Sequence, residues 1–194
     1  DGAELRVDLS VEIEPGHGYD VEFGRTGHAV RDAILSRLER EGFNALPFYP
    51  SFVRTDEPES GVKADPGSPR FSTGYWATRN RFGALVETHS WQPYPRRVAA
   101  TRATIHAMVD LAARDGAEWL KLAREADARA SALGGKPVAL SYTNSDAVRS
   151  VELRGYEFTR EQSAVSGTPW VRYDSSRPVD WQVPFKYEVV PALT

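Results

Sequence analysis

The spacing of apolar residues changes along the chain, and this change limits the fold more than any other feature of the sequence. Near the start, apolar residues alternate with polar ones, at Leu5, Val7, Leu9, Val11 and Ile13. This alternation predicts a half-buried strand over 4–13. Apolar residues then recur every fourth position, at Val30, Ile34 and Leu38. The longer period predicts a helix over about 26–41, with Gly42 as its C-terminal cap.

The middle of the chain alternates apolar runs with loop signals. Pro47 and Pro50 interrupt the apolar run 43–53, which therefore predicts a short edge strand or an extended loop. Residues 54–74 are polar and contain several prolines, and they predict a surface loop of a length that often serves as a lid or binding loop. Residues 82–90 read FGALVETHS, and the unbroken run Ala-Leu-Val predicts a central strand that is buried on both faces.

Two helical patterns follow, and a β-rich stretch completes the chain. The first pattern ends at Asp115-Gly116, a step that is expected to kink the helix or separate it from the second pattern. Beyond Gly135 the segments are short and β-like. Around Gly155 the apolar residues switch from odd to even positions, and this switch predicts a one-residue bulge. We therefore expect an α/β piece over 1–134 and a β-rich extension over 135–194 that packs on it.

The composition excludes several classes of protein. With 194 residues, 41% of them hydrophobic and 26% charged, the chain is expected to form a soluble globular protein. Its net charge of -3 and its scattered basic residues argue against nucleic acid as a partner. No apolar run approaches the roughly 20 residues that cross a bilayer. The absence of cysteine excludes disulfides and thiolate metal sites, and it leaves the compartment open, the periplasm and the outside of the cell included.

The four histidines do not predict a metal site. His17, His28, His89 and His106 lack the spacing that would bring two ligands to one ion. We expect His106 to be a half-buried structural residue and His17 and His28 to lie at the surface. The chain also lacks a nucleophile elbow of the form Gly-x-Ser-x-Gly.

Glu87 is the residue with the clearest potential for chemistry. It ends an apolar strand, and α/β sheets build their sites at the carboxyl ends of strands. Burial there would raise its pKa above about 4.3 and suit it to general acid or base catalysis. The alternative is a buried structural glutamate that is neutralised by Arg79, Arg81, Arg96 or Arg97. The residues alone leave both interpretations open.

Residues 70–98, RFSTGYWATRNRFGALVETHSWQPYPRRV, resemble the C-terminal active-site segment of the zinc metallocarboxypeptidases of the carboxypeptidase A-like family. The similarity covers about 1–115, and GYWATRNRFGALVETHS is its specific part. It implies that 1–134 form the C-terminal half of the mixed-sheet, phosphorylase/hydrolase-like α/β fold of that family. It further implies a zinc-dependent hydrolase, a metalloprotease that cleaves a peptide or amide bond next to a free carboxylate.

The resemblance also implies roles for individual residues. Glu87 would be the general base that activates a zinc-bound water and then protonates the leaving amine. Tyr75 would close over the terminal carboxylate of the substrate. Arg79 and Arg81 are suited by chemistry to bind that carboxylate, because a guanidinium group binds a carboxylate bidentately.

The zinc ligands of this family are a His-x-x-Glu pair and a later histidine, which in the branch that the chain resembles lies three residues before an Asp-Gly. The chain begins with Asp1-Gly2. The expectation is therefore a C-terminal fragment that is inactive alone, with its zinc ligands in the N-terminal part of the same protein.

Two other functions remain open. A relative with the same fold would use the same glutamate and zinc to cleave an N-acyl amino acid. A non-catalytic binding module would present the aromatic residues of the β-rich extension, Trp170, Trp181, Phe185 and Tyr187. Aromatic residues that alternate in strands are more often part of a core.

Overall fold

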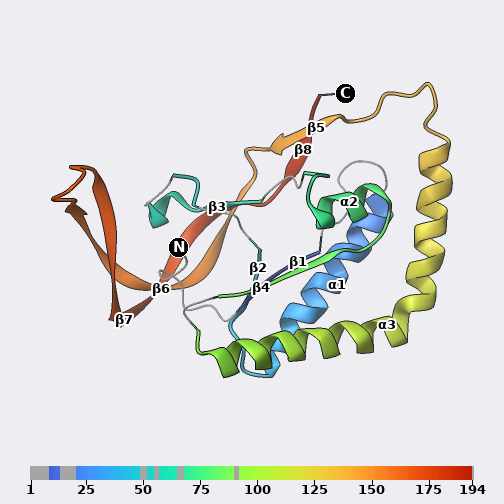
Figure 1. Ribbon diagram of the computed structural model, residues 1–194. Coiled ribbons are helices and arrows are strands. Elements are labelled where there is room, and N and C mark those ends of the chain that lie inside the picture. Colours follow the sequence, from blue (N-terminus) through green and yellow to red (C-terminus); the bar gives the residue numbers. More distant parts are fainter. Residues whose placement is uncertain are drawn as a thin grey trace. The chain divides into compact units, whose positions relative to one another are not determined.

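The computed structural model describes residues 9–13, 21–48, 52–54, 57–64, 68–89 and 92–193. In these parts the chain is α/β, with helices and a mixed sheet, as its sequence predicts (Figure 1). The elements are β1 (Leu9–Ile13), α1 (Val21–Arg40), β2 (Ala45–Pro47), η1 (Pro58–Ser60), β3 (Val62–Lys63), α2 (Ser72–Thr78), β4 (Ala84–Thr88), α3 (Tyr94–Ser131), β5 (Ser141–Asn144), β6 (Val148–Gln162), β7 (Pro169–Lys186) and β8 (Val189–Leu193). None of the helices in these parts combines the length and apolarity that a membrane span needs.

The chain divides into two compact units. The helical unit contains the described residues from 9 to 48, from 68 to 143 and from 189 to 193, and the ribbon unit contains those from 52 to 64 and Asn144–Glu188. This division differs from the predicted boundary after residue 134. The predicted surface loop 54–74 contains β3, which joins the ribbon unit because Val62 pairs with Phe185 of β7 in a parallel bridge.

The sheet of the helical unit has the strand order β2-β1-β4, with β1 parallel to β2 and antiparallel to β4. The predicted edge strand is confirmed in β2. The prediction of a central strand over 82–90 is wrong, because β4 is the other edge of this sheet within the described residues. Accordingly Ala84, Leu85 and Val86 are only half-buried, and Glu87 is exposed.

The core of the helical unit lies between α1 and α3. Val30, Ile34 and Leu38 of α1 pack against small residues of α3, namely Ala100, Ala103 and Ala107. Alanine side chains allow the two helix backbones to approach closely. Helix α1 begins at Val21, earlier than predicted, and ends where the sequence indicates.

The end of α1 confirms the predicted glycine cap. Gly42 has a φ of 81°, and its N–H donates to the carbonyl of Glu39. The N–H of Phe43 donates to the carbonyl of Leu38, so the helix ends in a Schellman motif. Phe43 and Leu38 both belong to the buried core, so the cap also directs the chain into the core.

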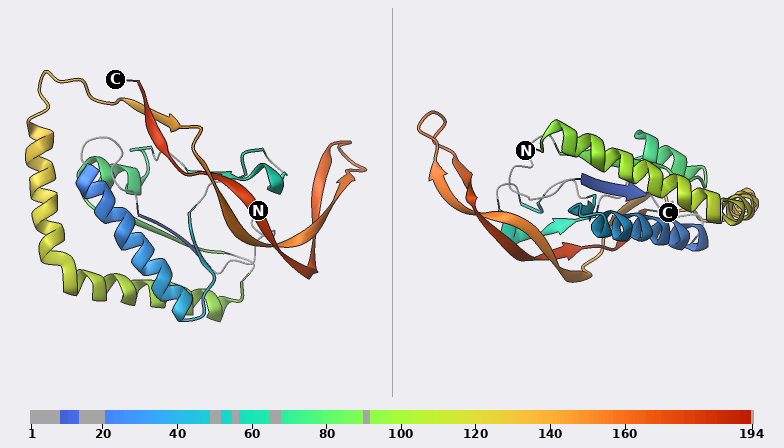
Figure 2. Two further views of the ribbon diagram at one scale, coloured as in Figure 1. Left: turned by 180° about the vertical axis from the view of Figure 1, so that it is seen from behind. Right: turned by 90° about the horizontal axis from the view of Figure 1, so that it is seen from below.

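The two predicted helical patterns beyond residue 94 form one helix, α3, which bends sharply in its middle part (Figures 1 and 2). The predicted kink at Asp115-Gly116 falls in this part of the helix. No neighbouring atom lies within 4 Å of a side chain built at Gly116. The two arms of α3 contribute to separate buried clusters, one around Ala103 and one around Ala123.

The ribbon unit is built on the long antiparallel pair β6 and β7. The predicted bulge lies near its expected place, but the extra residues are on the other strand. Tyr156 pairs with Pro178 and Glu157 with Asp174, which leaves three residues of β7, 175–177, outside the register. Trp181 packs over Gly155, where an added Cβ would lie 2.7 Å from the indole ring.

Candidate functional site

Glu87 lies near the end of β4, and its side chain is exposed. Ala84 and Val86 pack against the core of the helical unit. Since side chains alternate along a strand, Glu87 projects from the opposite face. The burial expected from the sequence is therefore not found. The alternative is also wrong, because among the described residues Glu87 forms no ion pair with any arginine.

Tyr75 lies on α2, a helix that the sequence analysis did not predict. The backbone N–H of Tyr75 donates to the carbonyl of Phe71 in the first turn of this helix. The Tyr75 ring packs edge-on against Trp76, with 5.4 Å between the ring centroids. It is 49% exposed, and its hydroxyl has no hydrogen-bond partner within the described parts of the chain.

A Schellman motif ends α2 and fixes the direction of the chain toward β4. Asn80 has a φ of 52°, and its N–H donates to the carbonyl of Ala77. The N–H of Arg81 donates to the carbonyl of Trp76. Asparagine is one of the few residues other than glycine that adopts this left-handed conformation at the end of a helix. The positive φ of Asn80 is thus explained by the turn alone.

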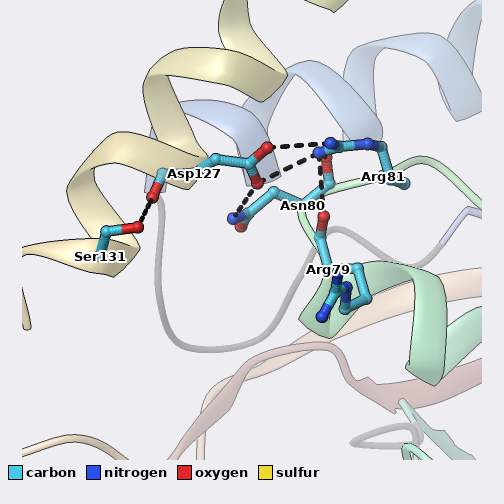
Figure 3. A network of polar contacts seen from close by, with 5 residues as sticks. All are labelled: Arg79, Asn80, Arg81, Asp127 and Ser131. Carbon is cyan, nitrogen blue, oxygen red and sulfur yellow. Dashed lines mark hydrogen bonds and ion pairs between the residues drawn. The ribbon is translucent and has the colours of Figure 1, made fainter.

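Arg81 has a structural partner that sequence reasoning missed (Figure 3). Its Nη1 donates to Oδ1 of Asp127 at 3.2 Å and its Nη2 to Oδ2 at 2.9 Å. The amide of Asn80 donates to the same carboxylate at 3.1 Å. Hydrogen bonds from Arg81, and then from Asn80, lower the pKa of Asp127. No local signal could indicate this pair, because Asp127 lies 46 residues away on α3.

The backbone carbonyl of Arg79 accepts a hydrogen bond from Arg81 at 3.0 Å, and the positive charge of Arg79 makes a smaller contribution to the lowered pKa of Asp127. The guanidinium group of Arg79 is exposed and forms no ion pair with another described residue. Tyr75 and Arg79 lie four residues apart at the end of α2, a spacing that brings side chains to one side of a helix. No hydrogen bond or ion pair among the described residues joins either of them to Glu87.

No family model, curated protein or solved structure matches the chain. Within the described residues, the functional groups of Glu87, Tyr75 and Arg79 form no hydrogen bond or ion pair, whereas the guanidinium group of Arg81 binds Asp127.

The histidines add no metal site in the part of the chain that the structure describes. No group of three His, Cys, Asp or Glu side chains there could hold a metal ion. His28 is exposed, as expected, and His106 is also exposed rather than half-buried. His17 lies outside the described residues, and His89 is half-buried.

The aromatic residues of the β-rich extension do not form one surface. Trp181 packs with Phe52, Phe158 and Tyr173, with ring centroids 6.0–6.2 Å apart. Phe185 and Tyr187 share a cation–π contact with Arg149, whose guanidinium carbon lies 5.3 and 5.2 Å from their ring centroids. Trp170 is exposed. Trp181 therefore packs with other aromatic side chains, as expected of a core residue.

Proposed function

We propose that this chain supplies the general base of a carboxypeptidase-like hydrolase that cleaves a peptide or amide bond next to a free carboxylate. The observation that carries the proposal is the exposure of the Glu87 side chain. This carboxylate stands on an ordered strand, is exposed, and is not used in any ion pair among the described residues. It is thus available to accept a proton from an attacking water and to give it to the leaving nitrogen.

The contacts of the two arginines support one of them as the carboxylate binder. Arg81 already donates to both oxygens of Asp127, so the two N–H groups that would bind a substrate carboxylate are occupied. Arg79 is free of ion pairs within the described residues, and a free guanidinium group can bind the terminal carboxylate of a substrate with two parallel hydrogen bonds. The unbonded hydroxyl of Tyr75 is suited to add a third hydrogen bond.

The resemblance that motivates this proposal also implies zinc and the mixed-sheet carboxypeptidase fold. The described residues do not fit a zinc ion, because no three potential ligands come together in them. A zinc ion in this enzyme would therefore need ligands outside these residues. The proposed role of Glu87 is to accept and donate a proton.

The test is hydrolysis by the protein at its full natural length. Wild type is expected to release the C-terminal residue of a peptide, and Glu87→Gln is expected to lower kcat by about 10²–10⁴-fold. Glu39→Gln is the matched control, because Glu39 is also an exposed glutamate of the helical unit. An equal kcat for wild type and Glu87→Gln would refute the proposal.

The choice of substrate separates the alternatives. A peptide and an N-acyl amino acid with the same terminal residue should be compared at equal concentration. A strong preference for the acyl amino acid would identify a deacylase that uses the same residues. If neither is cleaved with or without added zinc, a hydrolase is rejected and the binding module becomes the better interpretation.

A further inference from the structure

The helical unit contains a cavity of about 500 Å³ that the proposed reaction does not use. Its walls come from α1, from the segment between α2 and β4, and from both arms of the bent helix α3. Pockets of 300–1,000 Å³ typically hold small molecules. Ala84 lines this cavity, and Glu87 projects from the opposite face of the same strand.

The cavity has an aromatic wall centred on Phe82. The ring of Phe82 stacks on Phe23, with 4.4 Å between centroids and an angle of 10° between planes. Trp119 meets the same ring edge-on at 5.6 Å. These three rings and the aliphatic side chains around them offer a ligand apolar contact and ring stacking.

The charges at the cavity balance one another. Among the described residues that line it, Arg81 alone is charged, and its guanidinium group is neutralised by the carboxylate of Asp127. Asn80, the other polar lining residue, donates its amide hydrogen to the same carboxylate. The described lining residues therefore offer no unbalanced charge that would attract an ion.

Two exposed apolar side chains line the cavity from the two arms of α3. Val109 is 60% exposed and Leu120 is 51% exposed. Large apolar side chains that remain exposed beside a concave apolar surface mark binding sites more often than scattered ones do. A ligand in the cavity would cover both.

We infer that this cavity binds a small, uncharged, apolar molecule, preferably one with an aromatic ring. The inference rests on the fit of volume, aromatic lining and balanced charge, and it is independent of the role of Glu87. The lining residues of α3 extend from Met108 to Ala123, so the middle part of this helix forms one wall of the cavity.

Two fluorescent probes that share a ring system test the predicted charge preference. N-Phenyl-1-naphthylamine is neutral, and 1-anilinonaphthalene-8-sulfonate carries a sulfonate. Titrated into the chain, the neutral probe is expected to saturate at one molecule per chain. The anionic probe is expected to bind at least about tenfold more weakly, because the cavity offers no counter-charge.

Variants at exposed positions of α3 test where the probe binds. Val109→Asp places a charge beside the ligand and should weaken the neutral probe by about tenfold or more. Ile105→Asp is the matched control, because Ile105 is 53% exposed on the same helix and does not line the cavity. Circular dichroism should show that both variants fold.

Three results would overturn the inference. The first is an absence of saturable binding of the neutral probe. The second is an equal loss of affinity in Val109→Asp and Ile105→Asp. The third is a dimeric chain that Val109→Asp converts to a monomer, since a second copy would then be the occupant of the cavity.

Discussion

Arg81 and Asp127 form a two-point contact between guanidinium and carboxylate, at 3.2 and 2.9 Å, which joins the segment before β4 to the second arm of α3. Asn80 donates to the same carboxylate, and Asn80 is held by the Schellman motif at the end of α2. The contact thus links the turn that directs the chain into β4 to the part of α3 that lies beyond the bend (Figure 3).

Asp127→Asn should lower the free energy of unfolding by about 0.5–1 kcal/mol. The substitution removes one paired charge, and the gain from such a pair is reduced by solvent because both side chains are more than 40% exposed. Urea unfolding measures the difference. Asp115→Asn is the control, because among the described residues Asp115 pairs with its sequence neighbour Arg114 alone and should give no measurable change.

The same pair predicts a dependence of stability on pH. The pKa of Asp127 is lowered in the folded chain by Arg81 and Asn80. A lowered pKa contributes stability that is present above the unfolded value, about 3.9, and that is lost as the pH falls through the folded value. The stability difference between wild type and Asp127→Asn should therefore shrink below about pH 4. A difference that stays constant from pH 7 to pH 3 would exclude this contribution.

Gly155→Ala should destabilise the ribbon unit by about 1–3 kcal/mol, because its Cβ would lie 2.7 Å from the ring of Trp181 and force the ring to move. Denaturation followed by tryptophan fluorescence measures the effect. If the variant unfolds at the same urea concentration as wild type, Trp181 does not pack on Gly155 in solution.

Gly116→Ala should have the opposite effect. Gly116 lies inside α3, and an added Cβ meets no atom within 4 Å. Alanine is favoured over glycine in a helix by about 0.5–1 kcal/mol, so the midpoint of thermal unfolding should rise. A lower midpoint would show that the bend of α3 needs glycine.

Gly42→Ala tests the cap of α1. The φ of 81° at Gly42 is unfavourable for a residue with a Cβ, by about 1–2 kcal/mol. We expect a loss of stability of that size in urea unfolding, although no atom lies within 4 Å of the added Cβ. Gly134→Ala is the control, because Gly134 also has open space but does not have a positive φ.

Features that depend on a few neighbouring residues could be predicted from the amino-acid sequence. Three such features are the recurrence of apolar residues every fourth position in α1, the cap at Gly42 and the switch of apolar positions near Gly155. Each depends on backbone geometry within a few residues. Such geometry is set by local sterics and by hydrogen bonds between close neighbours. The helix and its cap are therefore confirmed. The irregularity near Gly155 lies close to its predicted place, but the prediction is wrong about its strand and size, because the three extra residues belong to β7.

The pairing of segments that lie far apart in the sequence depends on tertiary packing. The run Ala84–Val86 is compatible with a central strand or an edge strand, and the partners available to β4 decided that Glu87 is exposed. Val62 pairs with Phe185, and Arg81 binds Asp127. The partners are far apart in the sequence, and no local residue pattern predicts either pairing. Contacts of this kind depend on the summed packing of whole elements, and no short pattern of residues encodes that sum.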